Sequence, residues 1–547
     1  MKSINCIFQL LTLAILVTSC YKGDTADLII HNAKIYSCDK DFNVYDAMAI
    51  RDGKILQVGP EREILNGYSC DQIIDAELKP IYPGFYDAHC HFWGYANTFN
   101  TVNLVGSKSF NEVISRIIEF DETSNSQWIT GRGWDQNLWE DQSFPNNDSL
   151  SKLFPNKPIL IRRIDGHGAL ANKKALELAN INPETMIEGG QIMIKNGELT
   201  GILIDNAVDI VIDIIPELKT EQKLAFLKKA EYKLFEQGLT SINDAGITSI
   251  QRQDFMDWYT KGELTIKNYA MLFPDEGNLS YVLENGSFDS SHLHICSLKL
   301  IADGALGSRG ACLITPYSDS SDHFGTILRS KDKIESIAKF ADNVNFQLNT
   351  HCIGDSANRL LLNIYQDVIG QKPDHRWKIE HAQILNPEDF KFFEYLGVIP
   401  SVQPTHCTSD MDWAEDRIGS ERIPYAYAYK TLLNKAGIIA LGTDFPIENI
   451  SVLETYYAAV TRQKKTEGHG EPFHPAEQLT RQEALLGITR WAAFSNFEEK
   501  TRGSLEAGKD ADFVILTKDI MTIPDAEILN TFVFSTFLDG QQVYTVE

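Results

Sequence analysis

The stretch that decides the fold is "PIYPGFYDAHCH", residues 80–91. It is an apolar segment with the pattern of a strand, and it ends with His89 and His91. Side chains two apart in a strand project from the same face, so this pair could hold one metal ion at a rigid strand end. By itself the pair is weak evidence, because neighbouring histidines are often solvated or packed in a core. Its meaning depends on what the rest of the chain places beside it.

Strand and helix patterns alternate along the rest of the chain. The helical run "EQKLAFLKKAEYKLFEQG", for example, stops at Gly238 before the next apolar segment. Eight strands alternating with helices predict an α/β fold, a parallel (β/α)8 barrel of the TIM type. The predicted strands cover residues 80–91, 238–246, 265–273, 297–305, 345–355, 376–385, 397–406 and 437–446.

Residues of the kinds that bind metals stand at the ends of other predicted strands. His351 closes the fifth strand, His381 the sixth and Asp444 the eighth. The carboxyl ends of barrel strands converge at one face, where active sites of this architecture lie. Together with the histidine pair of the first strand, these residues predict a metal centre at that face.

The chain has 547 residues and a mass of 61.6 kDa, so more than one structural unit is expected. Alternating strand patterns with Asp-Gly turns recur near both ends, and each set is too small to bury both faces alone. They predict one small β-sandwich, made of residues 20–83 and 500–547, beside a barrel of residues 84–499; the alternative is an independent cap at each end. The first barrel connection is too long for a loop. Residues 93–220 are therefore predicted to form an inserted subdomain that shapes a substrate pocket.

Charge and cysteine content exclude some classes of protein. The chain carries 75 acidic and 50 basic side chains, a net charge of −25. Such a surface repels phosphate backbones, so no nucleic-acid partner is expected. Apart from Cys6 and Cys20, the cysteines are odd in number and form no CxxC pair, so no disulfide framework is predicted.

The first twenty residues have the pattern of an export signal rather than of a folded domain. Residues 7–17 are mostly apolar, and small residues precede Cys20. This resembles a bacterial lipoprotein signal, in which residues 1–19 are removed and Cys20 is lipidated; the alternative is an ordinary cleaved signal peptide. The apolar stretch is too short for a membrane span. The expectation is an exported protein of the cell envelope, facing the periplasm or the cell surface and held to a membrane only by the lipid on Cys20.

Ordered motifs extend this pattern over nearly all of the chain that follows the signal segment. On them the sequence resembles the amidohydrolase superfamily, and more narrowly amidohydrolase family 3, the branch that includes N-substituted formamide deformylases. The superfamily cleaves many amide, ester and cyclic ureide bonds, so the resemblance implies little about the substrate. The motifs are "PGFYDAHCHFWGYA", "GRGWDQNLW", "RRIDGHGALANKKAL", "GLTSINDAG", "LKLIADGALGSRGACL", "HCIGDSAN", "IEHAQIL", "PSVQPTHCTSDMDWAEDRIG", "LGTDFP" and "GSLEAGKDADFVIL".

The resemblance implies a metal site with one or two divalent ions. His89 and His91, with Asp444, would hold the more buried ion, and His351 and His381 a second. Imidazole and carboxylate ligands suit Zn²⁺, with Mn²⁺, Fe²⁺ and Ni²⁺ as rivals. A water between the ions would lose a proton near neutral pH and attack the scissile carbonyl. Asp444 would take that proton and pass it to the leaving amine.

Lys299 lies inside the apolar fourth strand, in "SLKLIADG". Superfamily members with two metals carry a carboxylated lysine at the equivalent strand, so the resemblance implies that Lys299 is a carbamate bridging two ions. The alternative is a lysine that reaches solvent along its stem or pairs with an acid.

Six further motif residues are candidates for substrate contacts, with an architectural role equally open for each. The insertion supplies the first three, and the last ends the seventh predicted strand. They are Trp134, Asp135, His167, Asp303, Arg309 and His406.

The sequence thus predicts a tethered, metal-dependent hydrolase of non-peptide carbon–nitrogen bonds in a small-molecule substrate, with an N-acyl or N-formyl amide as the expected target. One alternative keeps the metal site for an esterase, lactonase or cyclic amidase. The other is a catalytically silent surface lipoprotein that binds ligands in the barrel. The oligomeric state is left open, a homodimer included.

Overall fold

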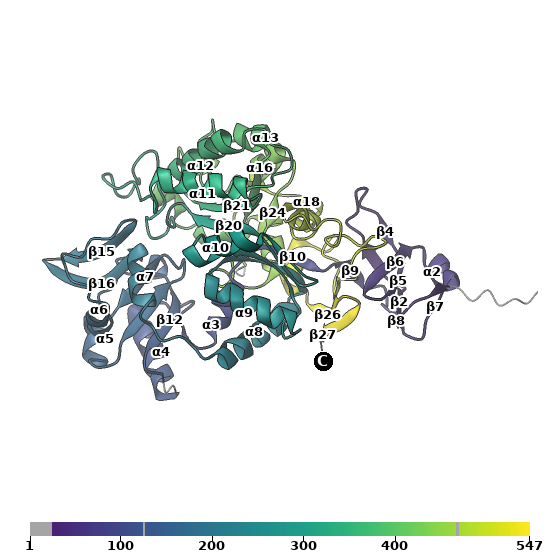
Figure 1. Ribbon diagram of the computed structural model, residues 1–547, viewed down its shortest axis with the longest axis horizontal. Helices are drawn as coiled ribbons and strands as arrows, with labels where there is room; N and C mark the ends of the chain where they lie inside the picture. The colour runs from purple at the N-terminus through teal and green to yellow at the C-terminus, as the bar shows by residue number, and fades with distance from the viewer. Residues whose placement is uncertain (1–23, 124–125, 466–469, 547) are drawn as a thin grey trace, which may run out of the picture.

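The computed structural model describes residues 24–123, 126–465 and 470–546 (Figure 1). A barrel occupies the centre, and Figure 1 shows a β-rich unit on one side of it and a mixed α/β insertion on the other. The signal-like segment with Cys20 lies outside the described residues. Within the described part of the chain, no helix is both long enough and apolar enough to cross a bilayer.

Eight parallel strands form the barrel, as predicted, and neighbours in the sheet follow one another in sequence. Its two ends meet where the backbone N–H of Asp444 donates to the carbonyl of His89 at 2.8 Å and that of His91 to the carbonyl of Phe445 at 2.8 Å. The predicted α/β fold with a TIM-type barrel is confirmed. The strands are β10 (Phe85–Cys90), β17 (Leu239–Ile247), β18 (Lys267–Leu272), β20 (Leu293–Ile301), β21 (Gln347–Cys352), β22 (Lys378–His381), β23 (Ile399–Val402) and β24 (Ala440–Leu441).

The first predicted strand is in fact two strands. β9 (Pro80–Pro83) belongs to the terminal β unit and β10 to the barrel, with Gly84 between them. A Cβ at Gly84 would lie 2.2 Å from Oγ1 of Thr240, which is in β17. Only glycine fits so close to the neighbouring strand, so this position marks the passage from one unit to the other.

Helices surround the barrel because one face of each is apolar. In α11 (Lys331–Asn343) the buried side chains recur at helical spacing: Ile334, Ile337, Ala338 and Ala341. A capping box of Thr480 and Glu483 begins α18 (Arg481–Gly487). The helices that cover the barrel include α8 (Thr220–Phe235), α9 (Ser249–Thr260), α10 (Glu276–Asn285), α12 (Asp355–Val368), α13 (Lys391–Leu396), α16 (Tyr429–Ala436), α17 (Val452–Thr461), α18 (Arg481–Gly487) and α19 (Arg490–Ser495).

The terminal strands form two packed sheets that share one apolar core, a β-sandwich. Both Asp-Gly hairpins have positive φ at the two turn residues, for example 51° at Asp52 and 72° at Gly53, as type I′ turns require. One sheet has the order β6 (Lys54–Gly59), β5 (Ala47–Arg51), β2 (Leu28–His31), β8 (Ile73–Asp75). The other, which mixes both ends of the chain, has the order β27 (Gln541–Thr545), β26 (Val533–Leu538), β25 (Phe513–Leu516), β9, β3 (Lys34–Tyr36), β4 (Val44–Tyr45).

A buried lysine joins the sandwich to the barrel. Lys267, the first residue of β18, is 1% exposed, and its Nζ lies 2.7, 2.6 and 2.7 Å from carboxylate oxygens of Asp510, Asp512 and Asp539. A buried ammonium needs such partners. The three aspartates, which by spacing alone could hold a metal ion, therefore already hold a cation of the chain itself.

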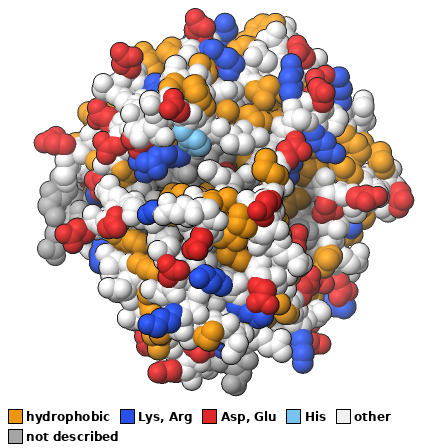
Figure 2. Space-filling model, turned by 90° about the vertical axis from the view of Figure 1, so that its left-hand side faces the viewer, with side chains coloured by type: hydrophobic (Ala, Val, Ile, Leu, Met, Phe, Trp, Pro, Cys, Tyr) orange, Lys and Arg blue, Asp and Glu red, His pale blue; other side chains and the backbone are white. Residues whose placement is uncertain are grey.

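The insertion has its own six-stranded sheet and its own apolar cores. Figure 2 views the molecule from this end, where acidic, basic and apolar side chains are intermixed. The sheet order is β11 (Val102–Asn103), β12 (Ile129–Trp134), β13 (Ile159–Arg163), β14 (Gly168–Ala171), β16 (Glu198–Asp205), β15 (Gly190–Lys195). The helices around it are α4 (Phe110–Thr123), α5 (Asp148–Leu153), α6 (Lys173–Leu178) and α7 (Asn206–Ile212), whereas α3 (Phe92–Thr98) packs against α8 and β17 of the barrel.

Candidate metal centre

Histidines from three barrel strands meet at the carboxyl end of the barrel. The rings of His89 and His91, at the end of β10, are 5.5 Å apart between centroids. The ring of His381, the last residue of β22, lies 4.8 Å from that of His89 and 4.5 Å from that of His351 in β21. The barrel thus gathers the four histidines that the sequence separates by up to 292 positions (381 minus 89).

Asp444, which follows β24, lies among these rings. Its Oδ1 is 3.1 Å from Nε2 of His91 and 3.7 Å from Nε2 of His89, and its Oδ2 is 3.1 Å from Nε2 of His406. Two groups of possible ligands therefore share this carboxylate. One is His89, His91 and Asp444, and the other is His381, His406 and Asp444.

His406 and His351 are placed differently from the sequence expectation. His406, expected as a substrate contact, belongs to the second group of possible ligands, whereas His351 belongs to neither group. Nε2 of His351 lies 3.8 Å from Oδ1 of Asp303. Burial lowers the pKa of His406, but hydrogen bonds to Asp444 and Glu448 outweigh it and raise that pKa to about 10. In that charged form His406 donates to Asp444 and orients it, and it cannot bind a metal ion at the same time.

The chemistry of the group fits a divalent cation. Among the described residues, Oδ1 of Asp444 and Nε2 of His351 are buried without a hydrogen-bond partner, which is rare for buried polar atoms. Burial, reinforced by the charge of Lys299, lowers the pKa of His89 to about 4. Burial also lowers the pKa of His381 well below its usual range. The imidazoles of His89 and His381 are therefore held in the neutral form that metal binding requires.

Two side chains behind the histidines fix their orientation. Nδ1 of His89 lies 2.6 Å from Oε2 of Glu380, and Nδ1 of His381 lies 2.6 Å from Oε1 of Gln403. Each contact holds Nδ1 as the donor and leaves Nε2 free to face the centre. Sequence reasoning missed both residues. The available signal was Glu380, an acidic residue inside the short buried strand "KIEH".

Lys299 reaches the same centre from β20. Its side chain is buried, and Nζ lies 3.3 Å from Nε2 of His89. Burial lowers the pKa of this lysine below its usual value although Glu380 and Asp444 oppose the shift. The structure shows no acid within ion-pair distance of Nζ among the described residues, so the ion-paired alternative has no partner there.

The centre opens into a cavity of about 1280 Å³ between the barrel and the insertion. Asp135 and His167 line it from the insertion. Nδ1 of His167 lies 2.7 Å from Asp205, and its ring is 5.2 Å from that of His351. Asp135 accepts a hydrogen bond from Arg163.

Three of the sequence candidates do not line this cavity. Trp134 is fully buried in the insertion core, where its indole N–H donates to the carbonyl of Ile161 at 3.0 Å. Arg309 is bound to Asp319 instead, with Nη2 to Oδ2 at 2.8 Å. The expected substrate contacts of Trp134 and Arg309 are therefore not supported, because each side chain is committed elsewhere.

Asp303, the third, has an architectural place. Its carboxylate accepts backbone N–H groups of Cys312 at 2.8 Å, Ile353 at 2.9 Å and Gly354 at 2.8 Å. It thereby ties the loop after β20 to the loop after β21, directly beside His351.

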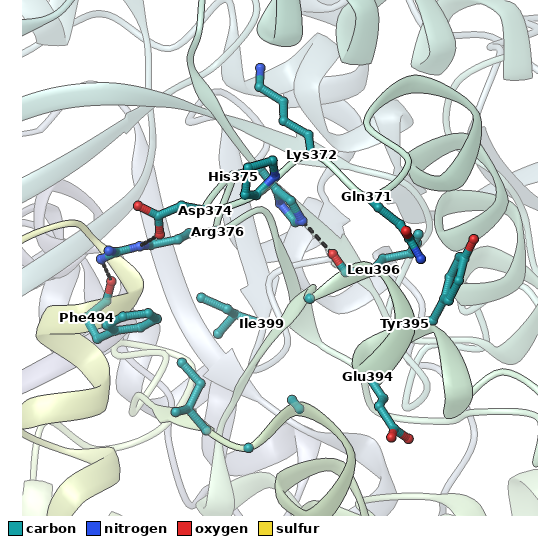
Figure 3. Close-up of a pocket in the computed structure, with 15 residues that line it drawn as sticks. Gln371, Lys372, Asp374, His375, Arg376, Glu394, Tyr395, Leu396, Ile399 and Phe494 are labelled. Atoms are coloured by element: carbon teal, nitrogen blue, oxygen red, sulfur yellow. Dashed lines mark hydrogen bonds and ion pairs between the residues drawn. The ribbon is translucent and has the colours of Figure 1, made fainter.

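A second, smaller cavity of about 550 Å³ lies at the opposite end of the barrel (Figure 3). His375 and Arg376 line it just before β22, and Ile399 lines it at the start of β23. Nε2 of His375 donates to the carbonyl of Leu396 at 2.7 Å, and Nε of Arg376 to Asp374 at 2.6 Å. The polar groups of His375 and Arg376 are thus already hydrogen-bonded to the protein. The candidate functional site is therefore the larger cavity, together with the histidines and Asp444.

Comparison with known proteins agrees with this geometry. A family model described as "Amidohydrolase family" matches residues 72–544. Protein LONG AFTER FAR-RED 3 of Arabidopsis thaliana is 31% identical over 95% of this chain and 92% of its own length. N-substituted formamide deformylase of Arthrobacter pascens is 24% identical over 94% of this chain and 97% of its own. The crystal structure of an uncharacterized metal-dependent hydrolase from Pyrococcus horikoshii OT3 has a TM-score of 0.74 and 27% identity, and covers 91% of this chain and 99% of that one.

Proposed function

The chain belongs to the amidohydrolase family as a metal-dependent hydrolase of carbon–nitrogen bonds, and on that premise we propose that its substrate is a small N-acyl or N-formyl amide. The observation that carries the proposal is the cluster of buried histidines around Asp444 at the floor of the large cavity. The relative named N-substituted formamide deformylase, similar over 94% of this chain, supports an N-formyl amide as the substrate class.

The residues that would hold the ions are those whose imidazole nitrogen or carboxylate oxygen faces the centre. His89, His91 and Asp444 form one set, and His381 with His351 would serve a second ion. Neutral imidazoles and a carboxylate favour Zn²⁺. When bound, such an ion polarises a carbonyl and makes a water molecule acidic near neutral pH.

Asp444 is placed to move the proton. Its Oδ2 is held by His406, whereas Oδ1 has no hydrogen-bond partner among the described residues. In the proposed reaction, water oxygen bonds to the acyl carbon while Oδ1 takes the proton. As the carbon–nitrogen bond breaks, Asp444 returns the proton to the leaving nitrogen, so that an amine and a carboxylic acid are formed.

We further infer that Lys299 is carboxylated in the active protein. A buried amine with a lowered pKa is the form that reacts with CO₂. Its Nζ is 3.3 Å from Nε2 of His89, so a carboxylate added to Nζ would lie among the possible ligands. The added negative charge would help two dications lie close together.

The experiment combines metal content with a substrate screen. The purified protein is loaded with Zn²⁺, its metals are counted by mass spectrometry, and it is tested on N-formyl and N-acetyl amides, esters, lactones and cyclic ureides. Hydrolysis of amides, abolished by chelation, is the expected result. A protein that binds metal but prefers esters or lactones would contradict the proposed substrate class. Absence of bound metal and of turnover would contradict the hydrolase assignment itself.

A further inference from the structure

Two arginines lie side by side on the insertion wall of the cavity. Arg132 in β12 and Arg162 in β13 are register partners on adjacent parallel strands, so their side chains leave the sheet on the same face. Both are half-buried and line the cavity. The next residue, Arg163, turns to the other side and is paired with Asp135 and Asp165.

Arg132 and Arg162 have no such acidic partner. Among the described residues, no carboxylate oxygen lies within 4.0 Å of either guanidinium. Their hydrogen bonds go to backbone carbonyls: Arg132 donates to Pro446 and Ile164, and Arg162 donates to Gly166 at 2.8 Å. Nε of Arg162 is buried and without a partner. Donor capacity and positive charge are therefore left for a ligand.

Neighbouring charges do not neutralise the pair. Burial, with the like charge of Arg162, lowers the pKa of Arg132 to about 9, although Asp444, Asp165 and Glu448 oppose the shift. Asp209 on α7 acts on Arg162 through its charge, and Asp444 and Glu448 act on Arg132 in the same way, but none of them forms an ion pair with either arginine; Asp165 is bound to Arg163. Two close cations in a half-buried wall cost free energy that a bound anion would recover.

The pair also lies close to the metal-type cluster. Arg132 donates to the carbonyl of Pro446, two residues after Asp444. A ligand whose acyl carbon is at the cluster can therefore extend a short chain to the arginines.

We propose that Arg132 and Arg162 form an anion subsite that binds a carboxylate of the substrate, so that N-acyl amides carrying a carboxylate are preferred over uncharged N-alkyl amides. The inference rests on the proposed amide hydrolysis and narrows its substrate class. Guanidinium groups bind carboxylates in bidentate geometry with charge-assisted hydrogen bonds. Arg309, expected from the sequence to contact the substrate, is bound to Asp319, and Arg132 with Arg162 takes this role instead.

The first test compares matched substrates. N-formyl ω-amino acids of increasing chain length are assayed against the same compounds with a terminal carboxamide. The wild-type protein should prefer one chain length of the acid by about tenfold to a hundredfold in kcat/KM, the range expected for hydrogen bonds to a charged group. R162Q should reduce this acid-to-amide ratio to near one, and R162K should retain part of it. R162K also keeps the test valid if R162Q folds poorly.

R116Q is the matched control. Arg116 is on α4 of the same insertion, is bound to Glu112 and to backbone carbonyls, and does not line the cavity. It should keep the wild-type ratio. Equal rates for acid and amide in the wild-type protein, or equal loss of both in R162Q, would overturn the subsite.

A binding measurement separates this inference from the proposed function. Calorimetry with the metal-loaded protein compares hexanoate with hexanamide. Hexanoate should bind at least tenfold more tightly to wild type than to R162Q, while hexanamide should not distinguish them. If no amide is hydrolysed but this difference is found, the function fails and the subsite stands. If amides are hydrolysed and hexanoate binding is unchanged in R162Q, the subsite fails alone.

Discussion

At the scale of single residues, Asp444 connects every part of the site. It contacts His91 and His406 through different oxygens and is common to both groups of possible ligands. Burial raises its pKa, but the hydrogen bond from His406 and the adjacent rings of His91 and His89 outweigh burial and hold the pKa well below its usual range. The carboxylate is thus ionised and ready to accept a proton.

Replacing Asp444 with Asn should therefore lower turnover by roughly 10²-fold or more, because the amide cannot accept the proton. The shape of the side chain is nearly preserved, so the fold should remain intact. Turnover, metal content and circular dichroism are measured on the same sample. Near-normal turnover with full metal content would assign proton transfer to another group.

Lys299→Ala should lose at least one metal and most activity if the lysine is carboxylated. Acetate or propionate should restore part of the activity by filling the space of the missing carbamate. Activation of the metal-free wild-type protein should improve when bicarbonate is added with the metal, because the carbamate needs CO₂. An unmodified amine beside a fully occupied site in a high-resolution map, or normal metal content in the alanine variant, would reject carboxylation.

At the scale of elements, the direction in which a side chain leaves an insertion strand decides whether it faces the cavity or the core of the insertion. The strand β12 presents Arg132 to the cavity and ends with Trp134, which packs in the core of the insertion. His167, in the turn between β13 and β14, lines the cavity opposite His351. Motif residues a few positions apart therefore have different roles.

His167 and Trp134 can be compared in a matched pair of variants. His167→Asn should change the ratio of kcat/KM between two amide substrates by roughly tenfold while the metal stays bound. Trp134→Phe should leave that ratio unchanged and destabilise the fold by roughly 1–3 kcal/mol, through the lost indole hydrogen bond and lost volume. Metal loss in His167→Asn would instead show that the insertion supports the barrel face itself.

At the scale of the whole molecule, buried charges tie the chain ends to the barrel. Glu498, 7% exposed, accepts the hydroxyl of Tyr86 in β10 at 2.6 Å and lies 3.6 Å from both His294 in β20 and Arg502. Burial raises the pKa of Glu498, but Arg502 and His294 outweigh it and lower that pKa from 4.5 to about 2.

Because the folded-state pKa is depressed, the stabilisation from Glu498 is complete above its unfolded-state value and is lost as the pH falls toward 2. Glu498→Gln should be less stable than wild type near pH 6, by up to about 3 kcal/mol from the size of the shift. The difference should shrink as the pH falls from 4.5 toward 2. Urea unfolding of both proteins across this range measures it. A difference that does not vary with pH would contradict the linkage.

The cellular placement is proposed from the first residues alone. Because Cys20 follows a lipoprotein-like segment, we propose that the protein is exported and held to a membrane by a lipid on this cysteine. Cys20→Ser should release the protein into the soluble fraction or leave it unprocessed, as fractionation and mass spectrometry of the N-terminus would show. An unmodified, soluble wild-type N-terminus would contradict the anchor.

The sequence by itself determined the barrel, the sandwich made by the two chain ends, and the four histidines and Asp444 that meet at the site. It could do so because periodicity reports local structure, and because strand order in a (β/α)8 barrel fixes which strand ends converge. The Asp-Gly hairpins and the capping box of α18 are local in the same sense, since turn and cap geometry depends on neighbouring residues.

Only the tertiary structure decided which motif residues face the cavity. Trp134 and Arg309 match the motifs as well as His167 does, yet one is in a core and the other is bound to Asp319. The sequence motifs assigned no role to Glu380 or Arg162. Their places at the site follow from the register between their strands and the neighbouring strands. Side-chain direction and free donor capacity depend on contacts between segments far apart in the chain, and a linear pattern does not contain them.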